Sequence, residues 1–361
     1  MNTKYKISFC TVSMNRLHHL KKTLPKNIFD NLDYNNVEYV VLDYNSHDNL
    51  SEWICTEERK YLDMGILKYY KTTDPVVFNR SHSRNMCFRL ATGDILCNID
   101  ADNFTGKGFA EYVNDKFQKE DDIFLTGNSS HRDTIGRVCI KKDDFMQVNG
   151  YNECIQDYGF EDNELYKRLI VFGKRQVGIE EFTYLKAIQH DNYERIANEK
   201  LNQGLKNIFV AYYNSYESDL ILEYEKKVVK ACIIDYITFF IKKNKIKQLS
   251  FANNLIFLKK PLQEGKIYKK NGKMIFEFFN QSNNEKIICN SNATELVNTN
   301  GKEHFYKVTD DNFKNDIILL LSEIANKQTI IYHSSNHVKV NETGFGKGII
   351  YTCRGIKQKL L

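Results

Sequence analysis

Residues 95–103 constrain the fold of this chain more than any other stretch. An apolar run ends in two carboxylates, Asp100 and Asp102, and Asn103 follows them. A buried strand has this pattern when its last residues leave a sheet at a ligand crevice. Side chains two positions apart on a strand point the same way, so both carboxylates are expected to face one cation, such as Mg²⁺ or Mn²⁺. Taken alone, the pattern also suits a solvated turn after a core strand.

The context of this stretch favours a ligand site. Strand patterns at 7–12, 37–42, 66–70 and 95–99 alternate with helical patterns, including one at 81–90. Such alternation predicts a mainly parallel sheet covered on both faces. Polar residues follow three of these strands, at 13–16, 43–48 and 100–103. Because ligands gather at the carboxyl ends of parallel strands, we expect the three polar segments to converge.

Length and composition allow two domains and exclude several classes of protein. The chain has 361 residues, and no apolar run approaches the ~20 residues that cross a bilayer. Its first residues are polar, so we expect no signal segment. Nine scattered cysteines form no C-x-x-C pair, which favours reduced thiols in a cytoplasmic protein over a disulfide framework.

Charge divides the chain unevenly. Residues 1–220 carry about −5 and residues 221–361 about +10 of the net charge of +5. Neither part has the basic density or a recognition motif of a nucleic-acid-binding protein, so no nucleic-acid partner is expected.

A second acidic block lies at 149–169. A loop containing Gly159 delivers Glu161 and Asp162 to the first turn of a predicted helix, with Leu165 and Leu169 on its apolar face. Carboxylates in a first turn are favoured by the helix dipole alone. The functional alternative is a rigidly held base beside a pocket.

The last third is less informative. Residues 220–247 read as one helix with lysines at both ends of its apolar centre, which suits core packing or contact with an anionic membrane. Asn271-Gly272 predicts a hairpin, 313–325 a helix and 329–332 a strand. We therefore expect a domain at 1–220, a helical linker or interfacial helix at 221–250 and a small α/β domain of unknown role at 251–361.

Residues 7–16, 40–48, 83–85, 91–94 and 98–102 together resemble the family 2 glycosyltransferases, in order and in spacing. The resemblance implies a GT-A fold, which is a Rossmann-like α/β domain. Three positions depart from the family pattern: Val12 stands where a Pro is usual, Tyr44 replaces a second Asp, and Cys87 replaces a Gly.

The resemblance also implies a nucleotide-sugar donor, with a UDP-sugar expected. Asp43 would accept a hydrogen bond from the base, although it could instead cap the following helix. Arg84 would lie near the diphosphate, although Arg80 and Arg84 could also pair with Asp94. The donor-binding residues implied are Ser13, Asn15, Arg16, Asp43, Ser46, Arg84, Asp100 and Ala101.

The block around Glu161 resembles the acceptor loop of the galactosyltransferase-like branch. By position, Asp162 becomes the catalytic base, and Glu161 and Tyr158 become acceptor ligands, while Phe160 stands where a second Gly is usual. His190 ends a predicted strand at 182–190. Family members with this loop often place a metal-binding His there, so Mn²⁺ or Mg²⁺ would be held by Asp102, His190 and Asp100.

The sequence thus favours a metal-dependent, inverting hexosyl- or N-acetylhexosaminyltransferase. It would act on a glycan or lipid-linked acceptor in cell-surface polysaccharide biosynthesis, in the cytoplasm or at the inner membrane face. One alternative is a nucleotidyltransferase, but residues 12–15 lack its basic, glycine-rich phosphate loop. The other is a non-catalytic glycan-binding module, which would have no reason to keep two clusters of carboxylates.

Overall fold

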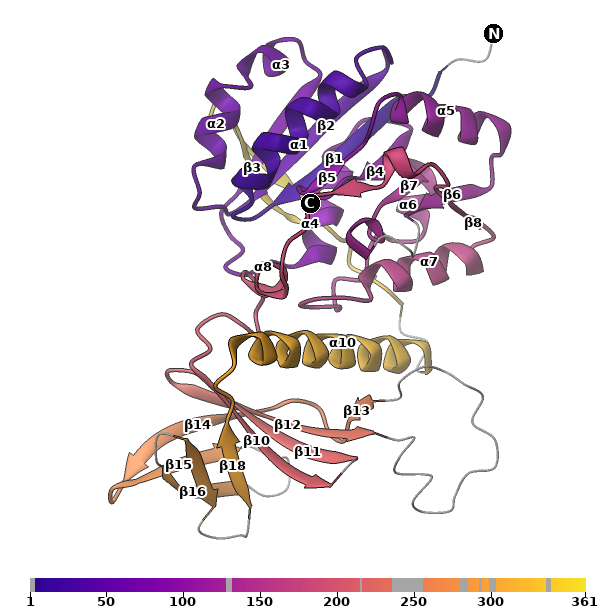
Figure 1. The fold of residues 1–361 in the computed structure, drawn as a ribbon. Helices are drawn as coiled ribbons and strands as arrows, with labels where there is room; N and C mark the ends of the chain where they lie inside the picture. The colour runs from indigo at the N-terminus through magenta and orange to yellow at the C-terminus, as the bar shows by residue number, and fades with distance from the viewer. Residues whose placement is uncertain are drawn as a thin grey trace. The chain divides into compact units, whose positions relative to one another are not determined.

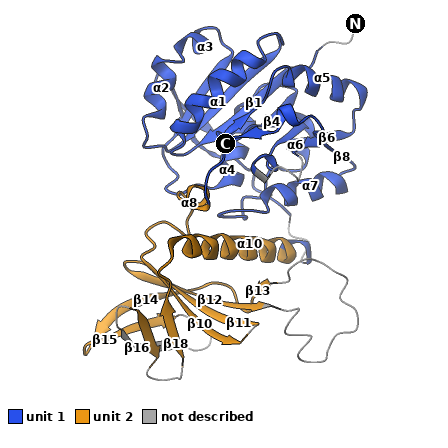
Figure 2. Ribbon diagram, viewed as in Figure 1, with its two compact units in different colours: residues 1–191, 333–361 blue, residues 192–332 orange. Residues whose placement is uncertain are grey.

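The computed structural model describes residues 4–127, 132–214, 216–235, 256–278, 285–291, 294–298, 303–335 and 339–361. The chain forms two compact units, one of residues 1–191 with 333–361 and one of residues 192–332 (Figure 2). These boundaries differ from the expected ones at 220 and 250. The reason is that the end of the chain returns to the sheet of the first unit instead of staying with the second.

The first unit is built on a nine-stranded sheet with the order β20-β19-β3-β2-β1-β4-β7-β6-β8 (Figure 1). Strands β3, β2, β1 and β4 run parallel to one another, whereas β7 runs antiparallel to both β4 and β6, and β19 runs antiparallel to β3. The expected α/β fold with a mainly parallel sheet is confirmed. The strands are β1 Ile7–Ser13, β2 Val37–Tyr44, β3 Leu67–Thr72, β4 Ile95–Asn98, β6 Ile123–Thr126, β7 Val138–Lys141, β8 Arg175–Gly178, β19 Gly348–Thr352 and β20 Lys357–Leu360.

Each face of this sheet buries a separate apolar core, because successive strand residues point to opposite faces. Phe9 and Val41 face one core, which α1 and α5 cover, while Cys10 and Val40 face the other, which α4, α6 and α7 cover. The helices are α1 Leu17–Asp30, α2 Leu50–Thr56, α3 Arg59–Asp63, α4 Arg80–Leu90, α5 Phe109–Lys119, α6 Lys142–Gln147 and α7 Glu161–Val171.

The strand order reverses beside β1, and this reversal positions the site. β2 pairs with β1 on one edge, and β4 pairs with it on the other. In open α/β sheets the crevice at such a switch point is where ligands bind. The carboxyl ends of β1, β2 and β4 carry the segments 13–16, 43–48 and 100–103, as the sequence predicts.

The second unit is a mostly antiparallel sheet with a long helix. Pairing of β11 with β12 closes its sheet into a ring, with β13 outside, and α10 Asp311–Ser335 buries Ile318, Leu321 and Ile324. The strands are β10 Asn207–Asn214, β11 Glu217–Glu223, β12 Lys227–Asp235, β13 Ile256–Leu258, β14 Gln263–Lys270, β15 Lys273–Phe278, β16 Glu285–Ser291, β17 Glu295–Asn298 and β18 His304–Lys307. The remaining helix, α8, spans Asn192–Ile196.

Two predictions in this unit are confirmed and two are wrong. The hairpin at Asn271-Gly272 joins β14 to β15, and the helix at 313–325 lies within α10. Residues 220–235 form β11 and β12 instead of a helix, and 236–247 lie outside the described residues. The β-branched run around Val228 suits a strand equally well. Residues 329–332 continue α10 because the apolar pattern of the helix runs through them.

The first unit also corrects two expectations. Residues 182–190 form a short 3₁₀ helix, Phe182–Tyr184, and the two-residue strand β9, Lys186–Ala187, which pairs with β5 at Asn103–Phe104. Cys55 and Cys353 form a disulfide, so the cysteines are not all reduced as predicted. No helix of the described ranges combines the length and apolar content needed to cross a membrane.

A buried carboxylate ties the start of the sheet together. Glu38 on β2 is 2% exposed and accepts hydrogen bonds from Ser8 Oγ at 2.6 Å, Thr92 N at 2.6 Å and Lys68 Nζ at 2.5 Å. Burial acts to raise the pKa of Glu38, but these donors outweigh it and lower the pKa from 4.5 to about 2. The ionised form therefore stabilises the folded state above pH 4.5, and this contribution is lost as the pH falls toward 2.

Glu38→Gln is expected to lower the free energy of unfolding by about 3 kcal/mol at pH 7, because it removes the charge that these donors stabilise. The deficit relative to the wild type should shrink between pH 4.5 and 3 in urea titrations. Glu111→Gln, at an exposed ion pair with Lys4, is the control and should change stability by less than about 1 kcal/mol. A pH-independent deficit would contradict this assignment.

Candidate active site

Hydrogen bonds join the loops that follow β1 and β2. Asn15 adopts a φ of 58°, and its backbone N–H donates to Ser46 Oγ at 3.0 Å. Its side-chain oxygen accepts from the His47 N–H at 2.8 Å, and Asp48 accepts from the N–H of Leu17 at 2.8 Å. The two loops are therefore one rigid structure, and the predicted donor residues Asn15 and Ser46 lie together in it.

Asp43 lies beneath these loops and is fully buried. One carboxylate oxygen accepts from the Ser46 N–H and the other from Tyr69 Oη, both at 2.7 Å. Lys71 Nζ lies 3.5 Å from the second oxygen. Asp43 thus supports the following loop and does not cap α2, whose N-cap is Asn49, while its contact with a base stays a prediction.

The other predicted donor residues are less accessible than the sequence indicates. Ser13 is 1% exposed, and its carbonyl accepts from Ser46 Oγ at 3.3 Å. The carbonyl of Arg16 accepts the N–H groups of His19 and Leu20 at the start of α1. Ala101 is buried, and its carbonyl accepts from Thr23 Oγ1 at 2.6 Å. Through these groups, all three residues hold the backbone around the crevice.

Arg84 brings the two acidic motifs together. Its Nη1 donates to Glu161 Oε1 and to Asp162 Oδ1, both at 2.9 Å, and its Nη2 donates to Asp100 Oδ1 at 3.2 Å. The side chains of Arg84 and Glu161 are each 5% exposed, compared with 14% for Asp162 and 29% for Asp100. Arg84 was predicted to lie near a diphosphate or to pair with Asp94. In the structure it pairs with three other carboxylates and not with Asp94, and its place near a diphosphate stays a prediction.

These contacts separate the pKa values of two neighbouring carboxylates. Burial raises the pKa of Asp162 well above its usual value, and Arg84 does not offset this because Glu161 and Asp100 lie nearby. Burial acts in the same direction on Asp100, but the charge of Arg84 and a hydrogen bond from Asn98 outweigh it and lower the pKa. Neighbouring acids whose pKa values are pushed apart suit different roles in one reaction.

Gly136 and Asn98 form a wall of this cluster. Asn98 Nδ2 donates to Asp100 Oδ1 at 2.9 Å and to the Gly136 carbonyl at 3.0 Å. A Cβ on residue 136 would lie 3.0 Å from Asp162 Oδ2, 3.1 Å from Arg84 Nη2 and 3.3 Å from Asp100 Oδ2. Glycine is therefore required for space, and the charged groups meet directly against the backbone.

Asp102 belongs to a second pair, with His190. Asp102 Oδ2 lies 3.0 Å from His190 Nε2, and Oδ1 accepts from Asn103 Nδ2 at 3.1 Å. The carbonyl of Asp102 accepts a hydrogen bond from the N–H of Ile188 at 2.8 Å. This bond brings the segment before His190 next to Asp102. Asp102 and His190 thus lie together as predicted, whereas Asp100 contacts Arg84 and Asn98.

A buried arginine, Arg137, lies behind Asp102 and Asn103 and was not predicted from the sequence. Arg137 is 0% exposed, and its Nη2 donates to Asn103 Oδ1 at 3.1 Å and to the Phe104 carbonyl at 3.0 Å. Burial lowers its pKa to about 10. Arg137 thereby fixes the amide that contacts Asp102. Nothing in the local sequence distinguishes it from a surface arginine at the start of β7.

The predicted acceptor loop has a strained backbone. Asp157 and Phe160 adopt φ values of 58° and 72°, a region that costs bulky side chains roughly 1–3 kcal/mol. Phe160, where glycine is usual in the resembling family, ends this loop immediately before α7. The Arg80 guanidinium lies 4.7 Å from the ring centre of Tyr158. The loop thus places Tyr158 beside α4 and sets Glu161 and Asp162 at the start of α7.

A family model described as the N-terminal domain of galactosyltransferase matches residues 127–200. The match spans Gly136, Glu161, Asp162 and His190. This part of the chain is therefore similar to the galactosyltransferase family. Together with the α/β sheet, this match confirms the expected resemblance to GT-A glycosyltransferases, whereas membership of family 2 stays a prediction. No curated protein matches the sequence.

Some solved structures show a limited likeness to this chain. The mannosyltransferase PcManGT from Pyrobaculum calidifontis, in complex with GDP-Man and Mn²⁺, is 18% identical (TM-score 0.46; 55% of this chain and 63% of that chain covered). S. aureus TarS 1-349 is 14% identical (TM-score 0.43; 53% and 61%). Drosophila β1,4-galactosyltransferase 7, with xylobiose, is 17% identical (TM-score 0.38; 54% and 75%). The chain covers less than two thirds of the first two, and at these scores we infer nothing about function from any of them.

Arg84→Met is expected to lower the free energy of unfolding by about 3–5 kcal/mol at pH 7, since it leaves buried carboxylates without their cation. The loss should be smaller at pH 4, where the carboxylates can take up protons. Urea denaturation at both pH values measures it. Arg80→Met is the matched control, because Arg80 is half-buried and lies one turn earlier on α4. This substitution should lower the free energy of unfolding by less. Equal losses in the two variants would contradict the role given to Arg84.

Proposed function

We propose that the first unit transfers a sugar from a nucleotide-sugar donor, expected to be a UDP-sugar, to a hydroxyl group of a glycan or lipid-linked acceptor. The observation that carries this proposal is the cluster in which Arg84 joins Asp100, Glu161 and Asp162. It lies at the topological switch point of the sheet, and Glu161 and Asp162 fall within the segment that matches the galactosyltransferase family.

Asp162 is assigned as the general base. A base works best when its pKa lies nearer the working pH than that of an ordinary aspartate, and burial raises the pKa of Asp162. Its side chain is also more exposed than that of Glu161, so it is the better placed of the two to meet an acceptor hydroxyl. Glu161 and Tyr158 hold the acceptor in this assignment. Direct displacement with a single base inverts the anomeric configuration.

Asp102 and His190 are assigned as the metal-binding pair. One carboxylate and one imidazole 3.0 Å apart suit Mn²⁺, which accepts mixed oxygen and nitrogen ligands, with donor phosphate oxygens completing its shell. Asn103 and Arg137 orient the carboxylate from behind. A bound divalent ion supplies charge that stabilises the leaving diphosphate. Asp100, which Arg84 keeps ionised, lies two residues before Asp102 in the sequence and is the third candidate ligand.

The donor nucleotide is assigned to the joined loops of β1 and β2, where Asn15 and Ser46 lie together. This assignment suits hexosyl and N-acetylhexosaminyl donors equally. It also suits a role in cell-surface polysaccharide synthesis. Contact with an anionic membrane now rests on the basic charge of residues 221–361 alone, because residues 220–235 form strands.

Asp162→Asn is expected to lower kcat by roughly 10²–10⁴-fold with little effect on donor affinity, because it removes a base and keeps the shape of the side chain. Product analysis with a panel of UDP-sugars and acceptors in Mn²⁺ measures turnover, and calorimetry measures UDP binding. Asp143→Asn, an exposed carboxylate in the first turn of α6, is the matched control and should retain activity. Normal turnover by the Asp162 variant would exclude it as the base.

The metal assignment is tested through binding and needs no acceptor. Calorimetry should show that Mn²⁺ strengthens UDP binding to the wild type at least about tenfold, and that Asp102→Asn or His190→Ala removes this gain. Asp122→Asn, whose side chain is 80% exposed, should keep it. UDP affinity that is the same in Mn²⁺ and in EDTA for the wild type would contradict the assignment.

A further inference from the structure

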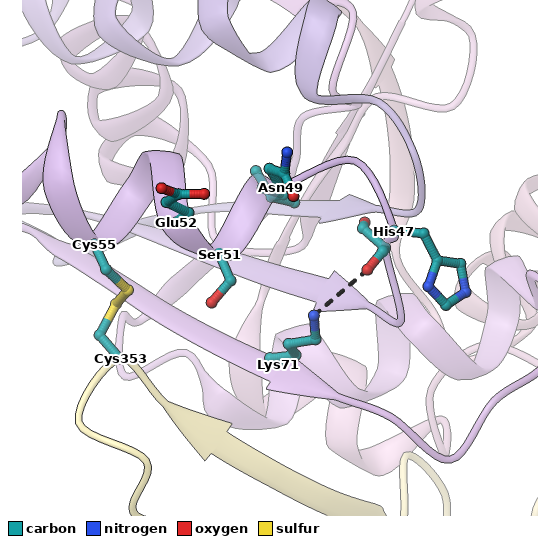
Figure 3. Close-up of a pocket in the computed structure, with 9 residues that line it drawn as sticks. His47, Asn49, Ser51, Glu52, Cys55, Lys71 and Cys353 are labelled. Carbon is teal, nitrogen blue, oxygen red and sulfur yellow. Dashed lines mark hydrogen bonds between the residues drawn. A yellow bond between two sulfur atoms is a disulfide. The ribbon is translucent and has the colours of Figure 1, made fainter.

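A polar cavity of about 430 Å³ lies outside the proposed reaction site, beside α2 and the ends of β2 and β3 (Figure 3). Ser46, Ser51, Glu52 and Lys71 line it, and so do both cysteines of the disulfide. Lys71 Nζ donates to the Ser46 carbonyl at 3.4 Å across one side. The cavity shares Ser46 with the proposed donor site but is not lined by Arg84 or its three carboxylate partners, and it brings solvent to a sulfur–sulfur bond.

The disulfide fastens the end of the chain to its beginning. Cys55 is near the end of α2, and Cys353 directly follows β19, 298 residues later. The hairpin of β19 and β20 lies at the edge of the sheet. β19 pairs with β3 through two residue pairs only, Tyr351 with Lys71 and Thr352 with Tyr70, and β20 pairs with β19 alone.

The hairpin also packs on the apolar core that α4, α6 and α7 cover. Ile350 and Leu360 are buried, and Arg89 on α4 donates to the Leu361 carbonyl at 2.5 Å. An edge hairpin with two ladder pairs is the kind of element that opens locally at low free-energy cost unless something fastens it. The covalent link to α2 supplies that fastening.

We propose that Cys55–Cys353 is a thiol-exchange site that latches the C-terminal hairpin to α2, with a low-molecular-weight thiol or dithiol as its reductant. The reductant enters through the cavity, and its thiolate attacks one sulfur to give a mixed disulfide and one cysteine thiolate. A second thiol then displaces the remaining cysteine. The products are two cysteine thiols and the oxidised reductant. The ammonium of Lys71, in the same cavity, favours the leaving thiolate.

Reduction then frees the hairpin to open from β3 and removes the wall that Cys353 gives the cavity. The loop 46–49, which forms the opposite wall, carries Ser46 and so belongs to the joined loops of the proposed donor site. Cleavage or formation of the disulfide therefore changes the surroundings of that loop. In this way the redox state of the solution affects the loop. The inference does not depend on the proposed function, because it rests on the sheet, the cavity and the disulfide.

Hydrogen–deuterium exchange on the full chain tests the latch. After equilibration with oxidised glutathione, addition of dithiothreitol should speed amide exchange at 348–360 by about tenfold or more, while β1 and β4 stay unchanged. Cys353→Ser and Cys55→Ser should each show fast amide exchange at 348–360 without reductant. Addition of dithiothreitol should not change this rate. Cys154→Ser, at an exposed free cysteine of the same unit, should respond as the wild type does.

Two results would overturn the proposal. One is an amide exchange rate at 348–360 that is the same with and without reductant in the wild-type protein. Two additional alkylated thiols would show that the reductant had cleaved the disulfide. The other is alkylation of all nine cysteines in the glutathione-oxidised, denatured protein, which would mean that the bond does not form. Both results are measured on the wild-type protein, with and without reductant or oxidant. The test therefore remains decisive even if either serine variant folds poorly.

Discussion

The site depends on one cation shared among three carboxylates. Arg84 projects from α4, whereas its partners come from the end of β4 and from the first turn of α7. The two acidic motifs lie more than fifty residues apart in the chain, and without this cation their charges would drive them apart. Because one guanidinium cannot fully neutralise three anions, the carboxylate with the highest pKa is the one that takes up a proton most readily. The contacts that assemble the cluster therefore also raise the pKa of Asp162, which is the property that the proposed base requires.

The support around this cluster consists largely of groups that present no charge to a ligand. Gly136 leaves space, Asn98 bridges a backbone carbonyl to Asp100, and Asn103 links Asp102 to the buried Arg137. Asp43 acts in the same way for the neighbouring loops. Residues of this kind set the positions of reactive groups to within tenths of an ångström, which is the tolerance that catalysis requires. They also explain why so many polar side chains in this unit are buried.

The sequence predicted the sheet of the first unit well because its strands are short apolar runs separated by polar turns. It also singled out Asp102, His190, Glu161 and Asp162 as candidate ligands and base from their residue types and spacing, and the roles of these residues stay predictions. It could not predict the partners of Arg84, since helical spacing shows which face a residue shares but not what packs there. It mistook β11 and β12 for a helix because short apolar runs suit both structures. The pairing of β19 with β3 left no local signal at all.

The return of the chain to its first sheet has a consequence for how the protein is made. Residues 192–332 form a unit of their own between two parts of the other unit. On a ribosome, β3 is complete long before its edge partner β19 has been synthesised. Until β19 and β20 have been synthesised, the first unit presents a bare strand edge to solvent, and such edges template association with other chains. Completion of the sheet therefore waits for a segment that lies far from its partner strand in the sequence, so a chain truncated before β19 would have a first unit prone to aggregate.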